Sequence, residues 1–105
     1  MSNWSVYLVR CGDGSLYTGI ATDVERRLEE HRAGRGARYV RGRGPLRLAL
    51  QRRVGDRALA LRVEARVKKL PRTRKEELIA RRTLVDELVA RIAGEPGRAA
   101  RGGTE

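Results

Sequence analysis

The sequence predicts an α+β fold: a small three-stranded antiparallel sheet with flanking helices, in the order β-β-α-β-α-α. Two short runs rich in β-branched and aromatic residues flank a glycine-rich turn, and a third run places leucine at every second position. The remaining chain holds amphipathic segments that begin with helix-capping residues. With 105 residues, 40% of them hydrophobic and none of them Phe, the chain has room for one core built on Leu, Val, Ile and Ala. We therefore expect a single domain over residues 1–93, followed by a disordered basic tail over residues 94–105.

A β-hairpin begins the chain, with strands predicted on either side of Gly12-Asp13-Gly14. A two-residue loop, Asp13-Gly14, would place Tyr7 and Tyr17 on opposite faces of the sheet, because a one-residue slip turns every side chain over. A three-residue loop instead pairs Tyr7 with Gly19 and puts both phenols on one face. We favour the longer loop because Gly14 suits the left-handed conformation that it requires.

The first predicted helix follows the hairpin. Thr22 is the expected N-cap, and Glu25 three residues later completes a capping box. This helix should run to about Arg32 and stop near Gly34. The glycine-rich segment 34–44 is then a loop, and Pro45 prevents a helix from continuing.

The second half of the chain contains one more strand and two more helices. Leucines at positions 46, 48 and 50 have the period of a half-buried strand, and Asp56 is the expected N-cap of a helix over residues 57–69. Thr73 and Glu76 form a second capping box before a helix over residues 73–92. The wide apolar face of that helix can either cap the core or form a homodimer.

The net charge of +11 is concentrated in one segment, since residues 26–53 alone carry +8. Clustered arginine suits a phosphate backbone, because guanidinium groups match phosphate oxygens and binding releases counterions. The charge therefore favours a nucleic-acid partner. One Cys and one His exclude an intramolecular disulfide and a His/Cys metal cluster. The sequence has no long apolar run and no secretory signal, so we expect no membrane association and a cytoplasmic location.

Five elements of this sequence resemble the GIY-YIG nucleases. Val6-Tyr7-Leu8 and Tyr17-Thr18-Gly19 stand where that family has its two strand tripeptides. Arg27 and His31 reproduce its R-x-x-x-H helix pattern, and Glu64 lies on the following predicted helix, where the family has its metal-binding carboxylate. The resemblance covers roughly residues 4–75 and is closest to small stand-alone members.

The resemblance implies one-metal hydrolysis of a phosphodiester bond. Tyr7 would act as general base toward water, its acidity raised by the cationic surroundings, and Tyr17 would position the water or the phosphate. Arg27 would stabilise the charge of the transition state, and His31 would assist proton transfer or orient a tyrosine. Glu64 would hold one Mg²⁺ (or Mn²⁺) ion, bound weakly without substrate because a single carboxylate leaves most of the coordination to water and phosphate.

Each of these residues also has a simpler interpretation. Arg27 can form a salt bridge with a neighbouring Glu, and His31 can sit at a helix C-terminus where its charge is favourable. Glu64 can pair with Lys68 four residues later. These alternatives stay open from the sequence alone.

The Gly-Arg loop, residues 34–44, follows the arginine helix and is the predicted nucleic-acid contact. Glycines let the backbone approach a phosphate, while Tyr39 can stack on an unpaired base. The expected contact residues are Arg35, Arg38, Tyr39, Arg41 and Arg43. The alternative is a solvated loop with Tyr39 against the sheet.

Taken together, the sequence favours a magnesium-dependent endonuclease that acts on DNA rather than RNA, selects structure and serves repair or recombination. The alternative is a nucleic-acid-binding module with a nuclease-like fold and weak or no activity. Two departures motivate it: Ile20 stands where some members have Lys, and the only Asn is Asn3, whereas several members use an Asn near the end of the domain. A basic scaffold protein with no site is a third hypothesis.

Overall fold

The structure is a computed structural model, and it describes residues 3–96. These residues form three strands and four helices in the order β-β-α-β-α-α-α, so the α+β fold class is confirmed. The elements are β1 (Trp4–Arg10), β2 (Leu16–Ala21), α1 (Val24–Arg32), a 3-10 turn (Arg38–Val40), β3 (Arg47–Gly55), α2 (Arg57–Lys68), α3 (Arg72–Ala80) and α4 (Thr83–Ala93).

The sheet is antiparallel, with strand order β2-β1-β3. In the hairpin, Tyr7 pairs with Gly19 and Val9 with Tyr17, which is the register of the three-residue loop. Gly14 has a φ of 87°, the left-handed conformation that this loop requires. The prediction that both tyrosines share one face is therefore confirmed.

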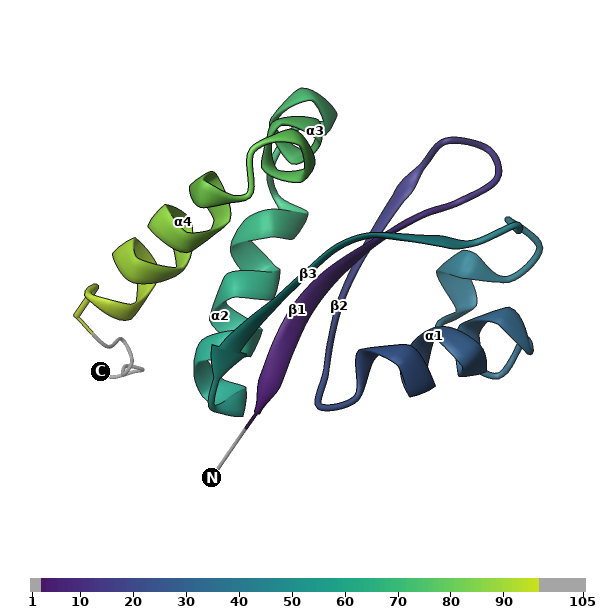
Figure 1. The fold of residues 1–105 in the computed structure, drawn as a ribbon, viewed down its shortest axis with the longest axis horizontal. Helices are drawn as coiled ribbons and strands as arrows, with labels where there is room; N and C mark the ends of the chain where they lie inside the picture. The colour runs from purple at the N-terminus through teal and green to yellow at the C-terminus, as the bar shows by residue number, and fades with distance from the viewer. Residues whose placement is uncertain (1–2, 97–105) are drawn as a thin grey trace.

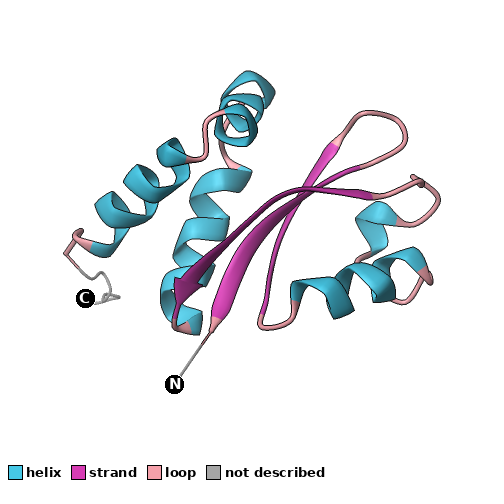
Figure 2. Ribbon diagram, in the orientation of Figure 1, coloured by secondary structure: helices cyan, strands magenta, loops and turns pink. Residues whose placement is uncertain are grey.

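Helices cover both faces of the sheet (Figure 1). On one face, α2, α3 and α4 enclose a core that includes Val6, Leu8 and Val63. On the other face, α1 and the segment after it cover Tyr7 and Val9. Figure 2 shows the three strands as a central layer between the two groups of helices. Because successive side chains of β1 point to opposite faces, the two tyrosines lie on the α1 side.

Two details of α1 and β3 differ from the predictions. The N-cap of α1 is Asp23 and not Thr22: the Asp23 carboxylate accepts a hydrogen bond from Arg26 N at 3.0 Å. In β3, a register shift pairs Leu50 with Leu8 and Leu48 with Val9, so these two leucines point to opposite faces of the sheet. The predicted single leucine face is therefore wrong, because the β-bulge places an extra residue between them; Leu46 and Leu50 are buried in different clusters and Leu48 is 36% exposed.

The predicted helix over residues 73–92 is two helices. Arg81 has extended backbone angles and separates α3 from α4. The second capping box is also absent: α3 begins after Pro71 with no side-chain cap, and Glu76 pairs with Arg10 instead. Asp56 does cap α2 as predicted, accepting from Leu59 N at 2.8 Å. The apolar residues Val85 and Ile92 of α4 are fully buried, so its apolar face caps the core.

The end of the chain is described only in part. Glu95, in the segment predicted as a disordered tail, forms a 2.8 Å ion pair with Arg66 of α2. The remainder of that tail, residues 97–105, lies outside the described residues. Within residues 3–96, no helix is long and apolar enough to cross a membrane.

Candidate functional site

Tyr7 and His31 form the centre of the site. Tyr7 comes from the middle of β1 and His31 from the last turn of α1, and both side chains are buried, with 1% and 2% of their surface exposed. The Tyr7 hydroxyl lies 2.8 Å from His31 Nε2. The backbone N–H of Ala37 donates to His31 Nδ1 at 3.1 Å. Because Nδ1 accepts, the neutral imidazole carries its proton on Nε2 and donates it to the Tyr7 oxygen.

Two glycines make this arrangement possible. A Cβ at position 19 would stand 2.5 Å from the Tyr7 hydroxyl oxygen and 3.1 Å from the Tyr17 ring, so only glycine lets the phenol lie across β2. A Cβ at position 36 would overlap His31 Nδ1. Gly36 and Ala37 were not among the predicted site residues. The glycine-rich composition of the loop signalled a close backbone approach, but not that the approach is to His31.

The ionisation of the site is dominated by burial. Burial raises the pKa of Tyr7 to about 12, and the neighbouring Tyr17 and the Glu64 carboxylate also raise it, while the Arg27 guanidinium lowers it. Burial and the positive charge of Arg27 hold the pKa of His31 below its usual range, so this imidazole is neutral at pH 7. The expectation that cationic surroundings raise the acidity of Tyr7 is therefore wrong for the protein without substrate.

Arg27 of α1 lies beside Tyr7 of β1 and forms an ion pair with an acidic neighbour. Its guanidinium donates to Glu30 at 2.8 Å, so the salt bridge given above as the simpler interpretation is present. The side chain keeps 38% of its surface exposed, and its charge acts on both Tyr7 and His31. One salt bridge does not occupy all five donors of a guanidinium, so Arg27 can still bind a phosphate.

Glu64 lies on α2, and its charge makes a small contribution to the raised pKa of Tyr7. Its side chain is 17% exposed, the least of the acidic side chains that form ion pairs in residues 3–96. The ion pair with Lys68 exists, at 3.4 Å. In the described part of the chain, no group of three or more His, Cys, Asp and Glu side chains is placed to hold a metal. Magnesium keeps most of its waters and takes few protein ligands, so Glu64 is the carboxylate that would hold such an ion, with water and phosphate oxygens as its other ligands.

Tyr17 and Tyr39 continue the site outward. The Tyr17 ring lies 6.3 Å from the Tyr7 ring and 5.5 Å from the His31 ring. Tyr39 stacks on Tyr17 at 5.8 Å and remains 43% exposed. The interpretation that places Tyr39 against the sheet is therefore correct for its contact with Tyr17, while part of the ring still faces solvent.

The arginines of the Gly-Arg loop divide into two kinds. Arg43 is bound within the protein: it pairs with Asp13 at 2.6 Å, donates to the Tyr39 carbonyl at 2.6 Å and lies 4.4 Å from the centre of the Tyr39 ring. The side chains of the other three are exposed and form no hydrogen bond or ion pair within the described residues; they are Arg35, Arg38 and Arg41. These three are the ones free to bind an anion.

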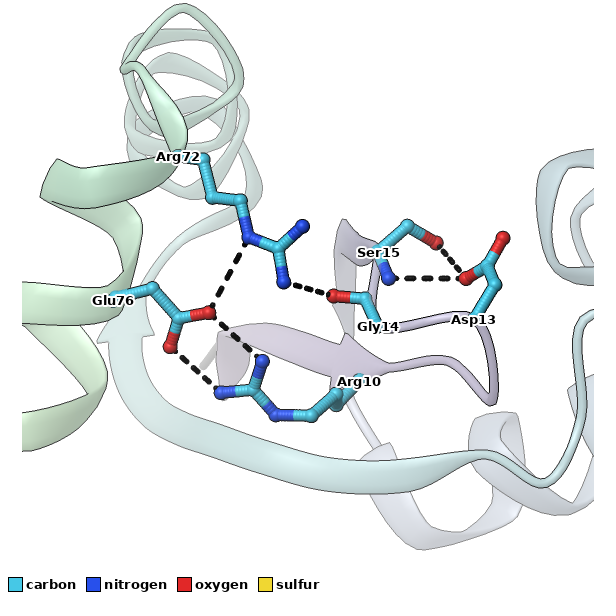
Figure 3. A network of polar contacts seen from close by, with 6 residues as sticks. All are labelled: Arg10, Asp13, Gly14, Ser15, Arg72 and Glu76. Carbon is cyan, nitrogen blue, oxygen red and sulfur yellow. Dashed lines mark hydrogen bonds and ion pairs between the residues drawn. The ribbon is translucent and has the colours of Figure 1, made fainter.

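The hairpin turn fixes Arg43 and also α3. Asp13 accepts from Ser15 and Arg43, and these contacts lower the pKa of its carboxyl to about 2. Arg72 of α3 donates to the Gly14 carbonyl at 2.6 Å, and Glu76 receives both ends of the Arg10 guanidinium (Figure 3). The sequence places Asp13 in the turn, but its ion pair with Arg43 was not predicted, because the two residues lie 30 positions apart.

An α+β domain of this topology, with two tyrosines and an arginine helix on one face and a carboxylate from the next helix, defines a nuclease-like fold. The model of the GIY-YIG catalytic domain matches residues 3–77, and the chain belongs to the GIY-YIG family.

The chain is also similar to curated proteins and to solved structures. The chain is 50% identical over 92 residues to the UPF0213 protein YhbQ of Escherichia coli, covering 88% of this chain and 92% of that protein. The solution NMR structure of EF2693 from E. faecalis has 36% sequence identity and a TM-score of 0.56, over 80% of this chain and 90% of that one. The solution NMR structure of the UPF0213 protein BH0048 from Bacillus halodurans has 47% identity and a TM-score of 0.49, over 74% and 83%.

Proposed function

We propose that this protein is a magnesium-dependent endonuclease that hydrolyses phosphodiester bonds in DNA. The observation that carries the proposal is the environment of Tyr7. Its phenol lies across Gly19 and accepts a hydrogen bond from a histidine of fixed tautomer. The charges of Arg27 and Glu64 both act on its pKa. A structural tyrosine in a core needs none of these groups.

Tyr7 is the general base of the proposed reaction, and Tyr17 positions the water or the phosphate. To accept a proton from water, Tyr7 must first release its own phenol proton to solvent and become a phenolate, which its pKa of about 12 opposes in the free protein. The Nε2–H of His31 and the charge of Arg27 both stabilise that phenolate. Arg27 also faces the phosphate, where it stabilises the transition-state charge. When bound at Glu64, one Mg²⁺ or Mn²⁺ ion supplies the positive charge that holds the phosphate and stabilises the leaving oxygen.

The proposed substrate is DNA with a structural irregularity, such as a nick, flap or branch, as occurs in repair or recombination. The three unpaired arginines of the Gly-Arg loop suit a phosphate backbone. The described residues form one small domain, with no second domain to read base sequence. A structural feature of the nucleic acid is then the available basis for selectivity.

A cleavage panel tests the proposal. Single-stranded, nicked, flapped and branched DNA, and the matching RNAs, are incubated with Mg²⁺ or Mn²⁺ and with chelator. We expect cleavage of at least one irregular DNA that requires the metal and falls roughly 100-fold or more in Glu64→Ala and Tyr7→Phe. Glu77→Ala is the matched control, because Glu77 is an exposed carboxylate on α3. Cleavage by Glu64→Ala at the wild-type rate would refute the assignment.

The raised pKa of Tyr7 favours a second candidate, a nucleic-acid-binding module with little or no turnover. This candidate predicts salt-sensitive binding to the whole panel without cleavage in either metal. Any cleavage that depends on Glu64 excludes it.

A homodimer through α3 and α4 also remains a prediction, and analytical ultracentrifugation of the protein tests it.

A further inference from the structure

A pocket with a volume of about 420 Å³ lies beside the site, where β2 turns into α1 and the first half of α2 faces that turn. No residue of this pocket except Arg27 belongs to the proposed catalytic machinery. Its size is within the range of small-molecule sites, roughly 300–1,000 Å³. The residues used in the argument are Trp4, Ile20, Arg26, Arg27, Arg57 and Leu61.

One part of the pocket wall is apolar and partly open to solvent. It contains Trp4, the only tryptophan of the chain, together with Ile20 and Leu61. Leu61 is 38% exposed, although it lies on a helix whose opposite face packs in the core. A nucleic-acid base stacks on an aromatic ring such as that of Trp4, and an exposed leucine lining the same pocket adds apolar surface.

The rest of the wall is positively charged. Arg57 lies 5.6 Å from the centre of the Trp4 ring and has no carboxylate partner within the described residues. Arg26 and Arg27 share Glu30, at 3.7 and 2.8 Å. Asp23, the other acidic residue of the wall, is engaged as the N-cap of α1. Arg57 is therefore the cation most available to a phosphate.

The pocket adjoins the catalytic residues along three elements. Arg27 belongs to both, Ile20 directly follows Gly19 on β2, and Leu61 precedes Glu64 by three residues on α2. Residues three apart lie on neighbouring positions of a helix surface. The pocket and the catalytic residues thus occupy neighbouring positions on the same three elements, at the edge of the sheet formed by β2.

We propose that the pocket binds one nucleotide of the substrate strand, next to the phosphate presented to Tyr7. The base stacks against Trp4 and Leu61, and Arg57 binds its phosphate. This inference rests on the proposed function and adds a substrate class: a strand in which one nucleotide near the cut is unpaired, since a base in a duplex cannot enter a pocket. Ile20, which departs from the family pattern, then serves as part of the pocket wall.

The first test uses the fluorescence of Trp4, the only tryptophan. A 5′-phosphorylated single-stranded hexanucleotide is titrated into the wild-type protein in chelator, so that no cleavage occurs. We expect saturable quenching, competed by deoxyadenosine monophosphate at lower concentration than by deoxyadenosine or inorganic phosphate, because base and phosphate are both bound. Binding seen by anisotropy of a labelled hexanucleotide without any change in Trp4 fluorescence would overturn the proposal.

The second test compares variants by the same anisotropy measurement. We expect Leu61→Ala and Arg57→Ala each to weaken hexanucleotide binding roughly tenfold. The control is Arg53→Ala, which removes the same charge as Arg57→Ala from an exposed position on β3, at the far side of the sheet. If all three variants weaken binding equally, only overall charge matters and the pocket is not a nucleotide site. If the wild-type protein shows Trp4 quenching but no cleavage that depends on Glu64, the nuclease function is rejected and the nucleotide pocket is retained.

Discussion

At the scale of single residues, a backbone hydrogen bond determines the tautomer of His31. The N–H of Ala37 occupies Nδ1, so Nε2 keeps its hydrogen and can only donate to Tyr7 while the ring is neutral. In the proposed reaction, His31 is thus a positioning residue that stabilises a phenolate at Tyr7, and it does not accept the phenol proton. Because Ala37 lies in the Gly-Arg loop, the conformation of that loop is coupled directly to the proposed base.

Gly19→Ala tests how closely the Tyr7 hydroxyl must be placed. The added Cβ would stand 2.5 Å from the hydroxyl oxygen, so the phenol has to move. We expect cleavage to fall roughly 100-fold, because a displacement of about 1 Å in a catalytic group has that cost. Gly94→Ala is the control, since its φ of −87° suits alanine and its nearest contact is 3.5 Å away. Wild-type cleavage by a folded Gly19→Ala protein would contradict the placement of Tyr7.

The buried neutral His31 also predicts how stability depends on pH. Its pKa is lowered in the folded protein, so the unfolded chain binds the proton more tightly. The contribution of His31 to the free energy of unfolding should therefore be constant well above pH 6.5 and fall as the pH drops from about 6.5 toward 5, by at most about 1.4 kcal/mol per pH unit.

Denaturant unfolding at several pH values measures this effect. His31 is the only histidine, so the fall between pH 6.5 and 5 should disappear in His31→Gln. Below about pH 4.5 both proteins lose further stability as paired carboxylates such as Glu76 are protonated. An equal slope in the two proteins above pH 5 would show that His31 is not buried as a neutral group.

The shared face of the two tyrosines could be predicted from local signals in the sequence, whereas Arg27, His31 and Glu64 were predicted through the resemblance to the GIY-YIG nucleases. Gly14 fixed the hairpin register, and the register placed Tyr7 beside Gly19 and on one face with Tyr17. The pKa of Tyr7 could not be predicted, since it depends on how completely α1 and the segment after it cover the phenol. The partnership of Asp13 with Arg43 joins residues 30 positions apart, and no local pattern announces it.

At the scale of elements, tertiary packing overrode two local patterns. The segment 73–92 has no Gly or Pro, yet it breaks at Arg81. A continuous helix of that length would extend about 30 Å, whereas the 12 residues of α2 span about 18 Å. The break lets α4 turn back and bury Val85 and Ile92 against the same core as α2. In β3, the bulge similarly sends Leu46 and Leu50 to different faces.

The attachment of α3 to the hairpin is the element-scale contact most open to measurement. Arg10 and Glu76 form two parallel hydrogen bonds of 2.7 and 2.8 Å, and their side chains are 27% and 37% exposed. A double-mutant cycle of Arg10→Ala and Glu76→Ala should give a coupling energy of about 0.5–1 kcal/mol, because the geometry is bidentate but solvent screens part of the interaction.

The matched control cycle is Arg74→Ala with Glu77→Ala. That pair is 3.5 Å apart within one helix turn and more than half exposed, so its coupling should be near zero. Denaturant unfolding of the four proteins in each cycle gives both values. A coupling at Arg10–Glu76 no larger than that of the control would mean that apolar packing alone holds α3 in place.

At the scale of the whole molecule, the structure refines what the net charge of +11 means. Many arginines form ion pairs within the protein: Arg10 with Glu76, Arg43 with Asp13 and Arg66 with Glu95. The exposed arginines without such partners include three on the Gly-Arg loop, next to Tyr7 and His31. The location of the unpaired charge, more than its total, therefore indicates where nucleic acid binds.

Salt dependence of binding tests this placement. Each phosphate contact contributes about −0.9 to the slope of the logarithm of the binding constant against the logarithm of salt concentration. Replacing Arg35, Arg38 and Arg41 together by Ala should make that slope less steep by about 2.7, measured by anisotropy with a short duplex. The control replaces Lys69, Arg81 and Arg82 by Ala, which removes the same charge from exposed positions at the end of α2 and between α3 and α4. Because the two triple variants have equal net charge, equal slopes would show that binding follows total charge, and the Gly-Arg loop would lose its assigned role.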